Sequence, residues 1–167
     1  MKEGAINIYH ERQSLQFCAL HALNNMTFGS VVSHFRNPHK SPLGTGNYDA
    51  NVIFSAIKSK GLDTIWFDRR KSPSTIDFDN IMGLLINSST HHLFGMFTTK
   101  HWFTIRKVQG LWVNLDSSLS YPATFKDEEE LVNHLSKIGQ EKNAEILIII
   151  DTKVCPTGYR PTETPSS

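Results

Sequence analysis

The sequence predicts an α+β fold in which helices pack on a mostly antiparallel sheet. Two segments in the first half carry apolar residues at helical spacing. The second half carries strand-like segments, two of them joined by a short-turn signal at Gln109-Gly110. A third helical segment, 127–139, precedes the last strand. At 167 residues the chain is long enough for one domain with a sizeable core.

Each of the first two helices has one apolar stripe that a sheet could cover. The segments are 18–26 and 48–57, and their stripes contain Ala19, Ala22, Leu23 and Met26 in the first and Val52, Ile53, Ala56 and Ile57 in the second. Residues 29–46 between them are rich in Ser, Pro, Asn and Gly, which predicts mostly loop.

Strands are predicted at 64–67, 84–86, 101–108, 111–116 and 144–150, with a short helical or looped piece at 77–82. The last strand is apolar on both faces and should be buried, and it is too short to span a membrane. From Thr152 the chain carries three prolines among Thr, Ser and Gly. We therefore expect one domain over 6–151 and a flexible tail over 152–167.

Charge and cysteine content narrow the class of protein. Seventeen basic and sixteen acidic side chains leave the chain almost neutral, which favours neither nucleic acid nor an acidic membrane surface as a partner. The two cysteines, Cys18 and Cys155, are too few for a disulfide framework, and the first residues show no signal-peptide pattern. We expect a cytoplasmic protein, with the nucleus as an alternative location.

Cys18 stands where the first helix begins, a position that stabilises a thiolate because the helix dipole and exposed N–H groups favour negative charge. Gln13, five residues earlier, carries an amide that could donate to an oxyanion together with the backbone N–H of Cys18. Taken singly, Cys18 is more typical of a small buried apolar residue than of a nucleophile, and Gln13 is more typical of a solvated loop residue than of an oxyanion donor.

His101 and Asp116 lie on the two strands beside Gln109-Gly110. A two-residue turn would pair Val108 with Leu111 and make His101 and Asp116 diagonal neighbours on one face of the sheet. A three-residue turn would place them on opposite faces. With Cys18 and Gln13 they supply a nucleophile, a base, an orienting acid and an oxyanion donor, which is the set that a cysteine hydrolase needs.

Other residues give weaker indications of a functional site. Cys18 and His21 have the spacing of half a zinc site, but the sequence offers no second pair, and the adjacent His91 and His92 would point to opposite faces of a strand. We therefore expect no metal and no organic cofactor. Trp102 is either a core residue or a side chain that lines the cleft beside His101 and binds substrate.

Five segments of the chain resemble the Josephin domain family: 9–13, 15–25, 44–53, 101–103 and 112–117. The resemblance spans roughly residues 8–150 and is strongest to the short, stand-alone members. It implies a papain-like cysteine protease fold and a deubiquitinase that acts on ubiquitin and ubiquitinated proteins. By position, Cys18 matches the nucleophile, His101 the general base, Asp116 the residue that orients the base and Gln13 the oxyanion-hole glutamine.

One segment departs from the family pattern. A helical hairpin arm normally follows the catalytic helix, but residues 26–43 contain Gly29, Pro38 and Pro42 and cannot form two helices. We expect a shortened arm. Two other functions stay open: a non-catalytic ubiquitin-binding module, and another Cys-His-Asp enzyme such as a transglutaminase-like or bacteriocin-processing peptidase. The segments 13–25 and 44–53 argue against the second.

Overall fold

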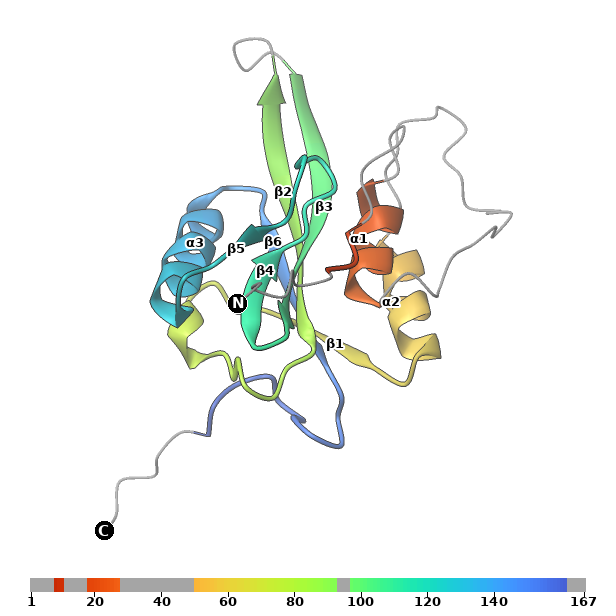
Figure 1. The fold of residues 1–167 in the computed structure, drawn as a ribbon, viewed down its shortest axis with the longest axis vertical. Helices are drawn as coiled ribbons and strands as arrows, with labels where there is room; N and C mark the ends of the chain where they lie inside the picture. The colour runs from red at the N-terminus through yellow and green to blue at the C-terminus, as the bar shows by residue number, and fades with distance from the viewer. Residues whose placement is uncertain (1–7, 11–17, 28–49, 93–96, 162–167) are drawn as a thin grey trace, which may run out of the picture.

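The computed structural model describes residues 8–10, 18–27, 50–92 and 97–161 (Figure 1). Gln13 and most of the predicted shortened arm, residues 28–43, lie outside these ranges. The helices and strands are α1 (Cys18–Met26), α2 (Ala50–Ser59), β1 (Asp63–Trp66), the 3-10 turn η1 (Pro73–Thr75), β2 (Gly83–His92), β3 (Phe97–Val108), β4 (Leu111–Asn114), β5 (Ala123–Thr124), α3 (Glu128–Gln140) and β6 (Glu145–Ile150).

The strands form one sheet in the order β1-β6-β2-β3-β4-β5, and every neighbouring pair is antiparallel. Helices α1 and α2 cover one face, and α3 lies on the other (Figure 1). The predicted α+β class, with helices on a mostly antiparallel sheet, is therefore confirmed. No helix within the described ranges is long and apolar enough to cross a membrane.

The core has two layers because successive residues of a strand point to opposite faces. In β2, Leu84 and Ile86 pack towards α3, whereas Leu85 packs towards α1 and α2. Strand β6 lies between β1 and β2, and its apolar residues alternate between the same two layers. This central position explains the uninterrupted apolar run of 146–150, since both faces of β6 are covered.

Helix α1 is fixed against β3 by polar contacts inside the apolar layer. The Thr104 hydroxyl donates to the Ala22 carbonyl at 2.6 Å, and the buried Arg106 guanidinium reaches the Met26 carbonyl at 3.5 Å. A cation at this end of α1 also complements the helix dipole. Gly83 allows the close approach, because a Cβ there would lie 2.9 Å from the Arg106 Cβ and 3.0 Å from the Met26 Sδ.

The turn between β3 and β4 contains two residues, as the sequence predicts. Gln109 and Gly110 both have positive φ, 49° and 85°, as a two-residue hairpin turn of the right-handed twist requires. Val108 pairs with Leu111, and the ladder continues to Ile105 and Asn114. The register on which the predicted site depends is therefore present.

Other element boundaries differ from the prediction in informative ways. Strand β2 continues from the predicted 84–86 to His92, and β3 begins at Phe97 instead of His101. The polar sequence of 87–92 hides this extension, because its ladder pairs with β3 and needs no apolar face. The two-residue strand β5 has no sequence signal. Helix α3 begins at Glu128, one residue after the predicted start, because Asp127 accepts the Glu130 N–H as an N-cap.

The expected flexible tail from Thr152 is wrong for residues 152–161. Cys155 is 4% exposed and belongs to the α3-side core. Tyr159 forms an isolated bridge with Ile76 and packs its ring 6.4 Å from that of Phe67. The segment has too few apolar residues for a core of its own, but it adds them to the core of the sheet. The folded domain thus continues beyond residue 151, and residues 162–167 lie outside the described ranges.

We expect Tyr159→Ala to lower the free energy of unfolding by about 2 kcal/mol. The substitution removes the ring from Phe67 and also the hydroxyl that accepts the Asp68 N–H at 3.1 Å. The matched control is Tyr121→Ala, where the tyrosine is 82% exposed and the loss should stay below about 0.5 kcal/mol. Urea unfolding measures both. Equal losses would show that residues 152–161 do not stabilise the domain.

Candidate active site

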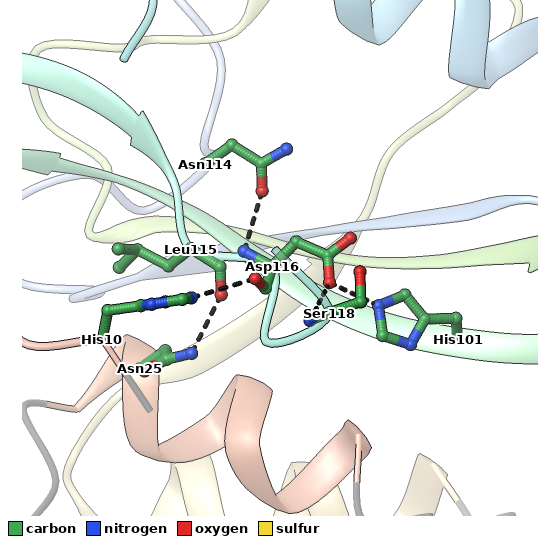
Figure 2. A network of polar contacts seen from close by, with 7 residues as sticks. All are labelled: His10, Asn25, His101, Asn114, Leu115, Asp116 and Ser118. Atoms are coloured by element: carbon green, nitrogen blue, oxygen red, sulfur yellow. Dashed lines mark hydrogen bonds and ion pairs between the residues drawn. The ribbon is translucent and has the colours of Figure 1, made fainter. Parts of the chain in front are cut away.

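Three elements bring Cys18, His101 and Asp116 together. Cys18 is the first residue of α1, His101 lies on β3, and Asp116 comes two residues after the end of β4. The His101 Nε2 lies 2.7 Å from the Asp116 Oδ1. Figure 2 draws this contact. The diagonal contact expected from the two-residue turn is therefore present in the structure.

The Asp116 carboxylate is held by its own loop as well as by His101. Its Oδ1 accepts the backbone N–H of Ser118 at 2.8 Å in addition to the His101 ring (Figure 2). The backbone N–H of Asp116 donates to the Asn114 side-chain oxygen at 3.0 Å. These contacts fix the carboxylate from two sides, so that it faces the imidazole without needing strand pairing of its own.

Two residues far away in the sequence hold the backbone of the same loop. The buried Asn25 side chain of α1 donates to the Leu115 carbonyl at 2.9 Å. The His10 Nε2 lies 2.9 Å from the Asp116 carbonyl oxygen. Figure 2 shows both contacts beside the carboxylate network. The loop is thus tied to α1, the helix that carries Cys18, and to the N-terminal segment.

The electrostatics of the three groups favour a charged pair between cysteine and histidine. Burial raises the pKa of the Cys18 thiol, but hydrogen bonds with the His101 ring and the Trp102 backbone outweigh burial and leave this pKa below its usual value. Burial lowers the pKa of His101, but hydrogen bonds with Asp116 and Cys18 prevail and raise it to about 9. The lowered pKa of the thiol and the raised pKa of the imidazole both favour a thiolate beside an imidazolium.

Asp116 stays ionised in this arrangement. Burial raises the pKa of its carboxyl group, but hydrogen bonds from His101 and Ser118 and the nearby imidazolium hold it below the usual range. Because the His101 Nε2 faces Asp116, the opposite ring nitrogen, Nδ1, is the one that remains for Cys18. The ring thus connects the carboxylate with the thiol, and the group can take up and return a proton.

The remaining predicted site residues have different outcomes. Trp102 is 5% exposed and packs in the layer under α1. It is therefore a core residue, which was the first of its two interpretations. Gln13 and the side chains of His91 and His92 lie outside what the structure describes. Among the residues that it does describe, no three His, Cys, Asp or Glu side chains are placed to hold a metal ion.

Sequence reasoning did not single out His10, Asn25, Asn114 or Ser118. Asn114 and Ser118 stand two residues to either side of Asp116, and Asn and Ser are typical of turns in which side chains bond the local backbone, so that signal was available. His10 and Asn25 are 106 and 90 residues away from their partners. No periodicity or spacing could have paired them with this loop.

The fold is consistent with the papain-like α+β type, and it places a helix-start cysteine against a strand histidine and its acidic partner. A sequence model of the Josephin family matches residues 26–150. Josephin-2 of Mus musculus is 34% identical over 170 residues, which covers 91% of this chain and 90% of that protein. The chain therefore belongs to the Josephin family.

Longer relatives also match. A Josephin-like protein of Arabidopsis thaliana is 34% identical over 166 residues, covering 82% of this chain and 46% of that protein. Ataxin-3 of Homo sapiens is 27% identical over 180 residues, covering 89% of this chain and 47% of that protein. This chain thus corresponds to about half of these two proteins and to most of Josephin-2.

We expect iodoacetamide to alkylate Cys18 at a lower pH than it alkylates an ordinary thiol such as glutathione, because the thiolate is the reacting form and the pKa of Cys18 is lowered. Asp116→Ala should move the onset of alkylation to higher pH, since the imidazolium that stabilises the thiolate loses its carboxylate. Mass spectrometry of the Cys18 peptide measures the rate at each pH. The same onset in both proteins would contradict the electrostatic account.

Proposed function

We propose that this protein is a cysteine-dependent deubiquitinase that hydrolyses the bond after the C-terminal glycine of ubiquitin. The observation that carries the proposal is the contact of 2.7 Å between His101 and Asp116, on a ring that also bonds the thiol of Cys18. Membership of the Josephin family supports ubiquitin and ubiquitinated proteins as the substrates.

The first half of the reaction transfers the acyl group to Cys18. The thiolate sulfur attacks the carbonyl carbon of the substrate glycine, and the carbonyl oxygen becomes an oxyanion. The backbone N–H of Cys18 at the start of α1 and the helix dipole stabilise that charge, with the Gln13 amide as the proposed second donor. The His101 imidazolium then protonates the leaving amine, the C–N bond breaks, and a thioester remains.

The second half releases ubiquitin. Neutral His101 takes a proton from a water molecule, and the resulting hydroxide attacks the thioester carbon. The C–S bond breaks, and the Cys18 thiolate returns beside protonated His101. Ubiquitin leaves with a new carboxyl group, which releases its proton to the solvent and becomes a carboxylate. Asp116 keeps the ring in one orientation through both halves and remains ionised, because the pKa of its carboxyl group is lowered.

Turnover of ubiquitin with a fluorogenic C-terminal amide tests the proposal. We expect Cys18→Ala to abolish turnover and His101→Ala to slow it by about 10³-fold. Asp116→Asn should cost only about tenfold, because an amide oxygen can still accept the bonds from His101 and Ser118. The matched control is Cys155→Ala, which removes the other free thiol from the α3-side core and should leave turnover within about twofold.

Three outcomes would contradict this account. Turnover by the Cys18→Ala variant would exclude Cys18 as the nucleophile. Equal losses in His101→Ala and Asp116→Asn would mean that Asp116 does more than orient the ring. A folded protein that binds ubiquitin without cleaving the amide would be the non-catalytic ubiquitin-binding module instead.

A further inference from the structure

The N-terminal segment 8–10 reaches the loop that carries Asp116. Ile8 packs on a small buried cluster formed by Val108, Val113 and Leu115. The two valines belong to the β3–β4 hairpin, and Leu115 is the residue that follows it. His10, two residues later, meets the Asp116 carbonyl oxygen at 2.9 Å (Figure 2). A carbonyl oxygen only accepts hydrogen bonds, so the His10 Nε2 must carry the proton and donate it.

We infer that His10 is a positioning residue, which holds the backbone of Asp116 so that its carboxylate faces His101. The inference rests on the proposed function, since it gives His10 a part in the reaction through the carboxylate that this reaction uses. His10 thus gives the segment before Cys18 a role in the site. Neither the sequence motifs nor the geometry of Cys18, His101 and Asp116 indicates this role.

The sheet pairing ends before Asp116. The β3–β4 ladder closes at Ile105 and Asn114, and one further backbone bond joins the Leu115 N–H to the Thr104 carbonyl at 2.8 Å. Asp116 lies beyond both. Its position therefore depends on bonds outside the ladder. Two lie within its own turn, from the Asp116 N–H to the Asn114 side chain and from the Leu119 N–H to the Asp116 carbonyl, and the third comes from His10. Rotation of the Asp116 backbone would carry the carboxylate away from the ring.

The Leu115 and Asp116 carbonyls each have a donor from a distant part of the chain, and the Asp116 carbonyl also accepts the Leu119 N–H at 3.0 Å within its own turn. Asn25 of α1 donates to the Leu115 carbonyl, and His10 donates to the Asp116 carbonyl, each at 2.9 Å. Asn25 therefore fixes the point at which the loop leaves β4. His10 fixes the residue that carries the carboxylate itself, and the packing of Ile8 keeps His10 in place.

The orientation of the Asp116 carboxylate affects Cys18 through the His101 ring. In the described part of the chain, the titratable groups that act on the His101 ring are Asp116, from the loop after β4, and Cys18, from α1. If the carboxylate loses its orientation, the imidazolium is less stable and the thiolate of Cys18 loses its partner. A residue that merely anchored the N-terminal segment would change stability and leave the reactivity of Cys18 unchanged.

The test is the pH profile of Cys18 alkylation by iodoacetamide in His10 variants. His10→Phe keeps a ring but lacks the N–H, and we expect alkylation at neutral pH to be about fivefold slower, with the onset at higher pH. His10→Gln should restore most of the rate, because its side-chain amide carries N–H groups at a similar distance from the backbone. Circular dichroism and thermal unfolding confirm that each variant is folded.

A double-mutant cycle decides whether His10 acts through Asp116. In the Asp116→Ala background, His10→Phe should have no further effect on alkylation. The control is His134→Ala, a partly buried histidine of α3 on the opposite face of the sheet, which should leave the profile unchanged. Should His10→Phe fail to fold, His10→Leu, which also lacks the N–H, carries the same test: a shift in the Asp116→Ala background as large as in the native one would contradict the inference.

Three results would overturn the inference: an unchanged profile in folded His10→Phe, an equal slowing in the Asp116→Ala background, or a His10→Gln variant no faster than His10→Phe. The reagent is small and needs no ubiquitin, so the proposed function is tested separately. Cys18 could lose reactivity in His10→Phe while the wild-type protein does not cleave ubiquitin. This result would support His10 as a positioning residue and reject the proposed deubiquitinase activity.

Discussion

The register of β3 against β4 is the constraint on which the candidate site depends. Two residues with positive φ, Gln109 and Gly110, close the hairpin and pair Val108 with Leu111. Side chains alternate along a strand, so a slip of one residue would move His101 to the face opposite Asp116. Gly110 adopts its left-handed φ of 85° without strain, whereas most side chains there would resist it. A local turn preference thus decides a contact between residues 101 and 116.

The second requirement is that α1 presents Cys18 at the same place. The helix is fixed to β3 along its length, by Thr104 at its middle and Arg106 at its end, so its first residue lies beside the Trp102 backbone. The apolar layer excludes water, and this strengthens the hydrogen bond between thiol and imidazole although burial alone would oppose both charges. The arrangement of the candidate site therefore depends on the packing of the core around it.

Sequence and structure agree where local chemistry is decisive. The helix-start cysteine and the hairpin turn depend on neighbouring residues, and the sequence predicted both of them. It did not predict features that depend on tertiary packing. The polar strand extension of 87–92 needed its partner strand, the segment around Cys155 and Tyr159 needed the core of the sheet, and His10 and Asn25 needed a loop 106 and 90 residues away.

The most direct test of the central claim is mass spectrometry of the protein after mixing with ubiquitin that carries an electrophile at its C-terminus. The account predicts one covalently attached ubiquitin, with the modified peptide containing Cys18 and none containing Cys155. Such an adduct needs recognition of ubiquitin and a reactive thiolate at the same site. A folded protein that forms no adduct, or that forms it at Cys155, would contradict the account.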